Sequence, residues 1–353
     1  MFDPIRRVAA IITLGLFGAI ATGCGAASTT TSSAGAVPSE VRITYTTCIC
    51  FTPEVVAIQK GWLKAELDKL HVRLVLQKYD TGVAQDSALL ANALDIALPG
   101  ATPTVSVIAQ GGPATIFMLS DNEDSIEGLV ARNGSGINKV ADLKGRTVGV
   151  PFGSTSDYGL AGALDSVGLS RSDVHIVNLA PASLTAAWQK KEVDAAYVWD
   201  PFLTNLVESG GHLVQTIGQL KAATNGKYQI VDLYLAREDF ARKYPTVLRA
   251  VATAIDRAAK YVNSNPAATA SEVYGELGIP SADAALTQIK GDHFYDATED
   301  RSAQWLGTPG HVGGLAQLLE GVWEFSYNAG KVSSKPSLDV IKAHIDPSAI
   351  QGV

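Results

Sequence analysis

Residues 143–158 read LKGRTVGVPFGSTSDY, and this stretch indicates the fold of the chain. The run of β-branched and apolar residues at 146–150 predicts a strand. A loop containing proline and glycine follows it, and residues 156–167 predict a helix because apolar side chains recur there at helical spacing. Strand, loop and helix in this order form the repeating unit of an α/β domain.

The same alternation is found on both sides of this stretch. Preceding strands are predicted at 41–47, 71–79, 95–98, 115–120 and 128–132, and helices at 53–70, from 82 to about 93, and at 103–110. Following strands are predicted at 175–179, 195–198 and 231–236, with a helix at 184–190 between the first two. Beyond 236 the pattern is only helical: 238–244, 245–264, 267–277, 281–290, 298–307 and 311–329.

Two α/β series in succession predict two lobes, because each series is long enough to bury a core of its own. A purely helical tail after the strand at 231–236 indicates that the chain returns to pack on the first lobe. We therefore expect lobe 1 to comprise residues 41–130 and 233–353, and lobe 2 to comprise residues 131–232. The hinge is expected at the crossovers near 128–132 and 231–236.

The N-terminus has the pattern of an export signal. Arg6 and Arg7 precede an apolar run at 8–20, and small residues stand directly before Cys24. The run is too short to span a membrane. It resembles a bacterial lipoprotein signal, in which residues 1–23 are removed and the cysteine is lipidated. An ordinary cleaved secretory signal is the alternative.

Residues 24–40 are rich in Gly, Ala, Ser, Thr and Pro and lack apolar periodicity, which is typical of a flexible tether. No later segment offers about 18 uninterrupted apolar residues, the length that a membrane span requires. We therefore expect a protein anchored by lipid to the extracytoplasmic face of the cell membrane.

The net charge of the chain indicates which classes of partner to expect. Without residues 1–23 the chain has 26 basic and 34 acidic residues, a net charge of −8. Nucleic acids and anionic membrane surfaces are bound through basic patches. We therefore expect neither of them as a partner.

Cys48 and Cys50 are the other cysteines of an exported, disulfide-permissive chain. A disulfide between residues two apart is strained in a β-strand, so we expect packing or loop thiols. A local redox or disulfide feature is the alternative. Metal binding by this pair lacks a second ligand pair at a plausible spacing, so no metal site is predicted.

The sequence also lacks the common catalytic motifs. It contains neither a G-x-S-x-G nucleophile elbow nor a phosphate loop ending in G-K-[ST]. The histidines are scattered and none has the H-E-x-x-H spacing of a zinc site. They are His71, His175, His212, His293, His311 and His344. We therefore expect no enzyme and no cofactor.

Ligands of open α/β sheets bind beyond the carboxyl ends of the strands, where the following helices present their N–H groups. The richest loop of this kind is 151–158, which ends at Tyr158. It carries three successive hydroxyls, those of Ser154, Thr155 and Ser156. Hydroxyls can donate to an anion, and the helix dipole favours negative charge at this end. Simple helix capping by Ser154 or Ser156 is the alternative.

Other strand ends are expected to face the same crevice. After the strand at 95–98, Gly100 permits close backbone approach and Thr102 offers a hydroxyl before the next helix. Trp199, at the end of the strand at 195–198, is better placed as a ligand wall that can stack or hold a cation than as a core residue. The neighbouring candidates are Thr47, Cys48, Ala101 and Asp200.

Asp232 lies in an otherwise apolar strand at the proposed hinge. A buried carboxylate without a partner is costly. It therefore requires either a cationic group of the ligand or a salt bridge to a protein lysine or arginine.

Several of these segments resemble the substrate-binding proteins of taurine and aliphatic-sulfonate ABC importers, most closely the taurine-binding branch. The resemblance extends from about residue 41 to 327. The segments that carry it are 143–158, 177–179, 186–189, 194–201, 244–245 and 292–295.

The resemblance implies a type II periplasmic-binding-protein fold, in which two lobes close on a small anionic or zwitterionic solute. It also implies a monomer that delivers the solute to a permease with a cytoplasmic ATPase. In such proteins the serine/threonine loop helps to hold the sulfonate, which would be the role of Ser154, Thr155 and Ser156 here. Asp232 would receive the amino group of taurine, and Trp199 matches the family tryptophan.

Two departures from the family pattern bear on the ligand. Cys48 and Cys50 occupy the first binding loop with an apparent extra residue, and Asp200 stands where the family often has a small residue. Either change can shift specificity away from taurine. The alternatives are another small solute, such as a sulfate ester, nitrate or a thiamine-precursor pyrimidine, or an exported sensor domain.

Overall fold

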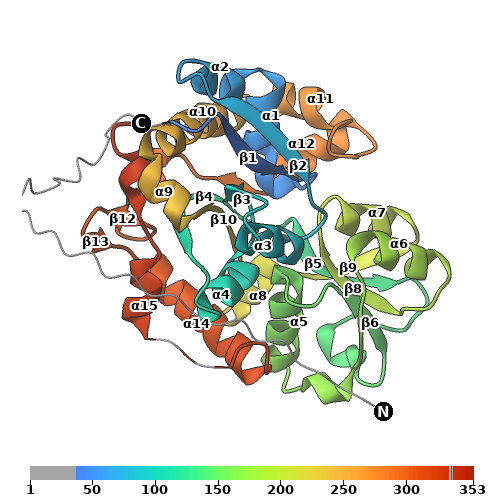
Figure 1. Ribbon diagram of the computed structural model, residues 1–353. Coiled ribbons are helices and arrows are strands. Elements are labelled where there is room, and N and C mark those ends of the chain that lie inside the picture. Colours follow the sequence, from blue (N-terminus) through green and yellow to red (C-terminus); the bar gives the residue numbers. More distant parts are fainter. Residues whose placement is uncertain (1–36, 334, 336) are drawn as a thin grey trace, which may run out of the picture. The chain divides into compact units, whose positions relative to one another are not determined.

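The computed structural model describes residues 37–333, 335 and 337–353, and two β-sheets form its framework (Figure 1). The first sheet has the strand order β11 (His293–Phe294), β4 (Ala114–Asn122), β10 (Val231–Arg237), β3 (Ile96–Ala97), β1 (Glu40–Tyr45) and β2 (Arg73–Lys78). The second has the order β7 (His175–Asn178), β6 (Thr147–Val150), β8 (Ala195–Trp199), β5 (Glu127–Arg132) and β9 (Gly211–Thr216). A separate hairpin joins β12 (Gly307–Thr308) to β13 (His311–Val312).

Both sheets are mixed. β1 pairs in parallel with β2 and β3, and β6 pairs in parallel with β7 and β8. β10 is antiparallel to β3 and β4, and β5 is antiparallel to β8 and β9. The predicted α/β class is therefore present in each lobe.

Helices connect and cover the strands. Those preceding β4 are α1 (Thr52–Gln59), α2 (Trp62–Asp68), α3 (Gly82–Leu90) and α4 (Ala101–Ala109). The second sheet carries α5 (Thr155–Ser166), α6 (Pro181–Gln189), α7 (Phe202–Glu208) and α8 (Ile217–Ala223). After β10 come α9 (Glu238–Lys243), α10 (Pro245–Ser264), α11 (Pro266–Val273), α12 (Ala282–Lys290), α13 (Ala297–Asp300), α14 (Leu315–Asn328) and α15 (Leu338–Ala343). Short 3₁₀ turns are η1 (Ile49–Phe51), η2 (Val140–Leu143), η3 (Arg171–Asp173) and η4 (Pro347–Ile350).

The chain passes from the first sheet to the second between β4 and β5, and it returns between α8 and β10. The helices after β10 then pack on first-sheet elements, because α10 contacts α1 and α2 while α14 contacts α4. Our proposed division into lobe 1 (41–130 and 233–353) and lobe 2 (131–232) follows these sheets in outline. Its boundaries differ by a few residues, because all of β5 lies in the second sheet and all of β10 lies in the first.

The structure differs from the expected elements at several positions. Two of these differences follow from glycines with positive φ values. The helix predicted at 53–70 is two helices, because Gly61 adopts a left-handed φ of +68° between α1 and α2. The helix predicted at 298–307 ends at Asp300, and the chain turns into the β12–β13 hairpin, where Gly307 and Gly310 have positive φ values. β9, β11, α7, α8 and α15 were not predicted.

The apolar core is continuous across the two lobes on one side of the molecule. One buried cluster includes Val105 of α4 and Trp323 of α14 together with Val148 and Tyr197 of the second sheet. Tyr158 of α5 contributes to this junction, with its ring centroid 5.2 Å from that of Phe325 in α14. Further clusters lie under α1, α2 and α10 in the first lobe and between α6, α7 and the second sheet.

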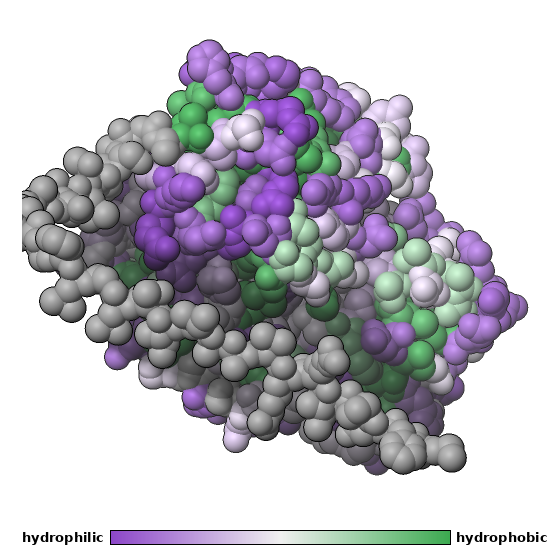
Figure 2. Space-filling view, in the orientation of Figure 1, coloured by the Kyte–Doolittle hydropathy of each residue, from purple (hydrophilic) through white to green (hydrophobic). Residues whose placement is uncertain are grey.

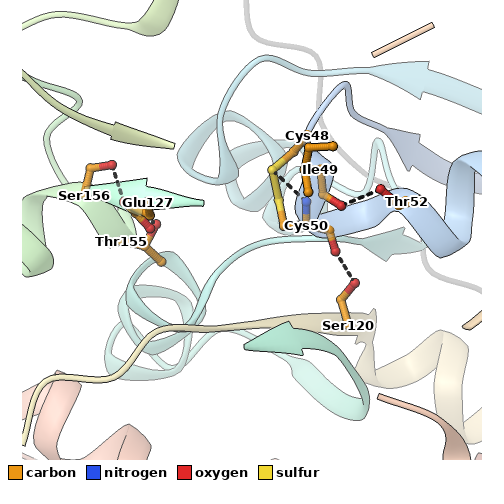
Figure 3. The surroundings of a disulfide bond; sticks show 8 residues. All are labelled: Cys48, Ile49, Cys50, Thr52, Ser120, Glu127, Thr155 and Ser156. Carbon is orange, nitrogen blue, oxygen red and sulfur yellow. Dashed lines mark hydrogen bonds between the residues drawn. A yellow bond between two sulfur atoms is a disulfide. The ribbon is translucent and has the colours of Figure 1, made fainter. Parts of the chain in front are cut away.

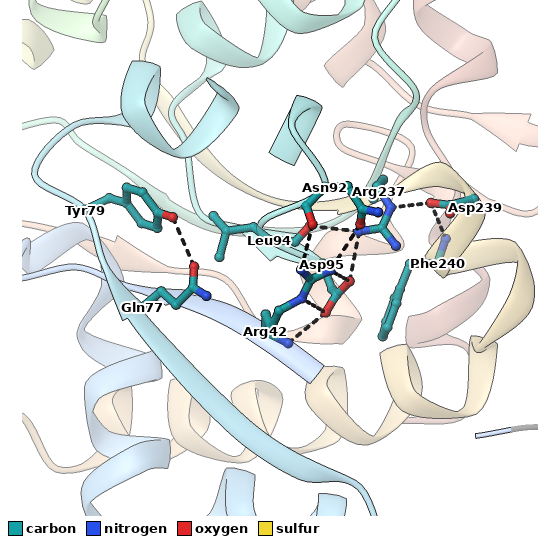
Figure 4. Close-up of polar contacts among 9 residues, drawn as sticks. All are labelled: Arg42, Gln77, Tyr79, Asn92, Leu94, Asp95, Arg237, Asp239 and Phe240. Atoms are coloured by element: carbon teal, nitrogen blue, oxygen red, sulfur yellow. Dashed lines mark hydrogen bonds and ion pairs between the residues drawn. The ribbon is translucent and has the colours of Figure 1, made fainter. Parts of the chain in front are cut away.

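An ion network holds the first sheet together away from the strand ends that face the second lobe (Figure 4). Asp95 accepts from Arg42 Nη2 at 2.8 Å and from Arg237 Nη1 at 2.9 Å, which links the start of β3 to β1 and β10. Burial acts to raise the pKa of Asp95, but the hydrogen bonds from Arg42 hold it below its ordinary value.

Hydrophilic residues cover much of the face seen in Figure 2, with apolar residues exposed in patches between them. Among the described residues, no helix combines the length and the apolar character needed to cross a membrane.

Candidate functional site

A small cavity lies where strand ends of the two sheets face each other. Its volume is about 50 Å³, which is room for roughly three to five water-sized groups. The lining residues are Thr46, Cys48, Cys50, Phe51, Asp80, Thr81, Gly82, Gln85, Leu98, Gly100, Pro103, Glu123, Ser154, Thr155, Trp199 and Asp232. Of these, Ser154, Thr155 and Trp199 belong to the second sheet and its helices, so both lobes contribute to the wall.

Half of the candidates from the sequence line this cavity. They are Cys48, Gly100, Ser154, Thr155, Trp199 and Asp232. The other half do not line it: Thr47, Ala101, Thr102, Ser156, Tyr158 and Asp200. Cys24 lies outside the described residues.

The candidates outside the lining have other contacts. Tyr158 is buried in the core, and its hydroxyl donates to the carbonyl of Lys227 at 3.1 Å. Asp200 accepts from the backbone N–H of Thr204 at 2.8 Å and lines a separate cavity beside α7. Burial raises the pKa of Asp200 to about 6. Ala101 and Thr102 are buried in the first turn of α4.

Three helices begin at the cavity. The N-cap residues of α3, α4 and α5 are Thr81, Gly100 and Ser154, and all three line the wall. The first N–H groups of a helix have no intrahelical acceptor, and the helix dipole places positive charge there. This part of the cavity is therefore suited to a negatively charged group.

The three hydroxyls at the start of α5 have separate roles. The Ser154 hydroxyl donates to the carbonyl of Pro151 at 2.6 Å and accepts from the backbone N–H of Asp157 at 3.4 Å, so Ser154 caps the helix. The Ser156 hydroxyl donates to Glu127 Oε1, and the Thr155 hydroxyl donates to the same oxygen at 3.3 Å (Figure 3). A serine hydroxyl has one proton to donate, so Ser154 and Ser156 use theirs within the protein.

Carboxyl groups also line the site, close to these helix N-termini. Asp80, Glu123 and Asp232 line the cavity, and its lining, as far as the structure describes it, contains no lysine, arginine or histidine. Burial raises the pKa of Asp232 to about 7 and raises those of Glu123 and Glu127. The charges of Asp232 and Glu127 add to the effect of burial on the pKa of Glu123.

A second pair of acids stands behind this group. Asp121 and Asp292 are close enough that each affects the pKa of the other, and burial raises the pKa of each, that of Asp292 to about 7. The charge of Asp232 adds to this effect on both groups. The acids of the site therefore favour the binding of a cationic group, whose charge would stabilise their ionised forms.

Trp199 and Gly100 shape the rest of the wall. Trp199 is half-buried, and its ring packs edge-on against Phe202, with centroids 6.4 Å apart. Gly100 forms a β-bridge with Asp232. A Cβ atom at Gly100 would overlap the Thr155 methyl group and lie 2.7 Å from Asp232 Oδ1. The lobes are therefore in contact at Gly100 and Thr155.

Cys48 and Cys50 form a disulfide, so the expectation of free packing or loop thiols is wrong and its alternative is found (Figure 3). The strand geometry assumed for these residues does not apply. Cys48 is the extended N-cap of η1 and Cys50 lies within that turn, which brings their Cα atoms to 5.2 Å. This separation is in the usual range for a disulfide.

Thr46 and Cys50, from the segment after the first strand, also line the cavity. The lining residues that were missed from the sequence are Phe51, Asp80, Thr81, Gly82, Gln85, Leu98, Pro103 and Glu123. Asp80, Thr81 and Gly82 stand directly after the predicted strand at 71–79, which was a usable signal. Glu123 had a weaker signal, because the strand before it was predicted to end at 120 and β4 ends at Asn122.

Comparison with known proteins found a family model, several relatives and solved structures that match this chain. The family model described as NMT1/THI5 like matches residues 49–269. The taurine-binding periplasmic protein of Escherichia coli K12 is 36% identical over 193 residues, which are 54% of this chain and 58% of the relative. A putative aliphatic sulfonates-binding protein of Bacillus subtilis 168 is 29% identical over 199 residues, 55% of this chain and 57% of the relative. The chain thus spans less than two thirds of these relatives' length.

Among solved structures, the alkanesulfonate-binding protein SsuA from Xanthomonas axonopodis pv. citri bound to MOPS matches with a TM-score of 0.72. The sequence identity is 19%, and the match covers 88% of this chain and 99% of that one. This likeness confirms the predicted type II periplasmic-binding-protein fold of two lobes. These relatives are named as binding proteins and not as enzymes, in agreement with the prediction from the sequence.

Proposed function

Because the chain belongs to the NMT1/THI5-like family, we propose that it is the extracytoplasmic solute-binding component of an ABC importer. Its solute is taurine or a closely related small aliphatic sulfonate with an amino group. It delivers this solute, as a monomer, to a permease that is driven by a cytoplasmic ATPase. The relatives named for taurine and aliphatic sulfonates support the solute class.

One observation carries the choice of solute: helix N-termini and buried carboxyls line the same small cavity. The N-termini of α4 and α5 favour an anionic group, and Asp232 with Glu123 favours a cationic one. A cavity of about 50 Å³ brings these two regions within reach of a short zwitterion. A simple anion such as nitrate or sulfate would leave the carboxyls without a cationic partner.

In this proposal the sulfonate accepts from backbone N–H groups of Thr155 and Ser156 in the first turn of α5. The N–H groups of Ala101 and Thr102 at the start of α4 serve it from the other lobe. Ser154 positions α5 by capping it, and Thr155 lines the cavity beside the solute.

The ammonium group meets Asp232 and Glu123, and Trp199 covers it with the face of its ring. Desolvating both charged ends is favourable only when each has its partner in place. Closure of the lobes on the solute therefore requires the amino group as well as the sulfonate.

Lipid anchoring at Cys24 is also a proposal, based on the signal pattern before it. Fractionation of cells that express a Cys24→Ser variant tests it, since release of the variant from the membrane fraction is expected. A variant that stays in the membrane fraction contradicts the anchor.

Thermal unfolding with taurine, ethanesulfonate, sulfate and nitrate tests the solute. A ligand at about 100 times its dissociation constant stabilises a protein by about 2.7 kcal/mol, which raises the unfolding midpoint by several degrees. We expect a larger shift with taurine than with ethanesulfonate, which lacks the amine. Absence of any shift with both sulfonates would reject the solute class and favour the pyrimidine or sensor alternatives.

The variant Asp232→Asn tests the ammonium site. Loss of a charged hydrogen-bond partner costs about 1.5–3 kcal/mol, so the affinity for taurine should fall roughly 10- to 150-fold. Ethanesulfonate should bind nearly as before. Asp200→Asn is the matched control, because Asp200 is a buried acid outside the cavity. Equal losses for both solutes would remove Asp232 from this role.

A further inference from the structure

Two sulfur atoms and two carboxyl groups converge in the cavity. Ligand atoms of Cys48, Cys50, Glu123 and Asp232 all lie within 4.8 Å of one another, and all four residues are buried. They come from three distant parts of the chain: the loop after β1, the residue after β4, and β10. Sequence spacing therefore does not reveal the group, because Glu123 and Asp232 are far from the cysteines and from each other.

The carboxyl side of the group has unused ligand capacity. Glu123 is 2% exposed, and no hydrogen-bond donor of the described residues reaches its Oε2 atom. Asp232 is 4% exposed. Since the described lining contains no basic side chain, a buried oxygen aimed into the cavity is available to a cation.

Cys48 and Cys50 offer no thiolate to a metal ion while the disulfide is intact. Metal ions bind cysteine as the thiolate. The loop is already held in a chelating shape. The Cys50 N–H donates to Cys48 Sγ at 3.2 Å, the Ser120 hydroxyl donates to the Cys50 carbonyl at 2.5 Å, and Thr52 donates to the Ile49 carbonyl at 2.7 Å (Figure 3). Breaking the sulfur–sulfur bond would leave both thiols in this loop.

We propose that reduction of the Cys48–Cys50 disulfide creates a four-ligand site for a divalent metal ion of the zinc type, formed by Cys48, Cys50, Glu123 and Asp232. Zinc bonds of about 2.3 Å to sulfur and about 2.0–2.2 Å to oxygen place tetrahedral ligands closer together than the present 4.8 Å limit, so small movements complete the site. Two thiolates select zinc over magnesium and calcium, which prefer oxygen ligands alone.

The redox step balances with a thiol or phosphine reductant. A dithiol gives two electrons and two protons to the disulfide, yields two thiols on the protein, and itself becomes a disulfide. A phosphine instead takes an oxygen atom from water, whose two protons complete the thiols. The metal ion then displaces the thiol protons, which pass to solvent.

This site goes beyond solute transport and does not depend on the identity of the solute. It uses the carboxyls that we assign to the ammonium group, so a bound metal ion and an amino solute exclude each other. Zinc binding to the reduced protein should therefore abolish taurine binding, while zinc should leave taurine binding by the oxidised protein unchanged.

Metal titration of the purified protein before and after phosphine treatment tests the site. A Cys24→Ser background removes the third thiol, so that a thiol count after denaturation reports only the Cys48–Cys50 pair. We expect the reduced protein to bind one zinc ion per chain at least about 100-fold more tightly than the oxidised protein. Cobalt should give thiolate-to-metal charge-transfer absorption in the reduced form only. Equal affinity in both forms, or cobalt binding without that absorption, would overturn the proposal.

Variants test the individual ligands. Cys48→Ser and Glu123→Gln in the reduced protein should each weaken zinc binding by at least about tenfold, the effect that even outer-shell changes have at metal sites. Glu54→Gln is the matched control, because Glu54 is a buried acid of α1 outside the cavity and its loss should leave zinc affinity unchanged. The midpoint of thermal unfolding without metal identifies a variant that fails to fold, and Asp232→Asn then replaces it. Wild-type affinity in folded Cys48→Ser and Glu123→Gln variants would reject the site.

Discussion

Gly100 shows how a single residue permits contact between the lobes. Its φ of −72° is available to any amino acid, so the requirement for glycine is space and not backbone conformation. The Thr155 methyl group of the second lobe and the Asp232 carboxyl occupy the volume where a side chain would begin. A side chain at this position must therefore move one lobe away from the other.

Gly100→Ala should weaken solute binding more than it weakens the fold. Overpacking by one methyl group costs about 1–3 kcal/mol, and separation of the lobes can relieve it at the expense of the closed state. We expect an affinity loss of roughly 5- to 150-fold by calorimetry. Gly275→Ala is the matched control, since no atom lies within 4 Å of a Cβ there.

Adding Thr155→Ser to Gly100→Ala removes the methyl group that the new Cβ would meet. Part of the affinity should therefore return in the double variant. If the single variant binds as wild type, lobe contact at this position has no part in solute binding.

The residues of the site differ in how well the sequence predicts them. Asp232 and Trp199 were identified because a carboxylate in an apolar strand and an aromatic residue at a strand end are both conspicuous. Glu123 was missed because β4 continues two residues beyond the predicted strand end. The pairing of Asn122 with Val231 and His293 extends this strand, and neither partner is near in sequence.

At the scale of elements, the start of α5 combines a structural and a binding role. The Ser154 side chain caps the helix, while the N–H groups of the next two residues belong to the first turn and have no intrahelical acceptors. The sequence suggested that three hydroxyls exceed the needs of one cap. In the structure Ser154 provides the cap, and Glu127 of β5 accounts for the contacts of Thr155 and Ser156.

Ser154→Ala should destabilise the unliganded protein by about 1 kcal/mol, the usual cost of losing an N-cap. Ser154→Gly should cost only a few tenths, because glycine is tolerated at this position. Urea unfolding of the two variants measures the difference. Equal stability of Ser154→Ala and wild type would show that the hydroxyl does not cap α5.

Elements with strong local patterns were predicted, and elements that depend on distant partners were not. β6 and α5 follow from the residues between 143 and 167, where β-branched and apolar residues are followed by a loop and a helical period. β9 is half-exposed and mixed in character, and its pairing with β5 determines it. The disulfide was missed for a similar reason, because the turn η1 replaces the assumed strand geometry.

At the scale of the whole molecule, buried acids outside the cavity make stability depend on pH. Burial raises the pKa values of Glu54, Asp86, Asp200 and Asp300 above their ordinary range. A carboxyl whose pKa is higher in the folded state binds a proton more tightly there than in the unfolded chain. Its contribution to stability is complete at low pH and is lost as the pH rises through the folded-state pKa.

For Asp200 the pH range of this effect is defined, because its pKa is about 6 in the folded protein and 3.8 ordinarily. Between about pH 4 and pH 6 its contribution should decline by on the order of 3 kcal/mol. Asp200→Asn keeps an acceptor for the Thr204 N–H and should flatten the profile of unfolding free energy over this range. Asp68→Asn, an exposed change on α2, is the control. An unchanged profile in Asp200→Asn would show that this carboxyl ionises alike in both states.

The contact between Gly100 and Thr155 also has a kinetic consequence. Both lobes contribute to the wall of the cavity, and in our proposal they close on the solute, so we expect the solute to leave when that contact opens. Its dissociation rate cannot exceed the rate at which the lobes separate. The residence time of the solute is then set by the rate at which the lobes open. A permease that separates the lobes would therefore release tightly and weakly bound solutes at similar rates.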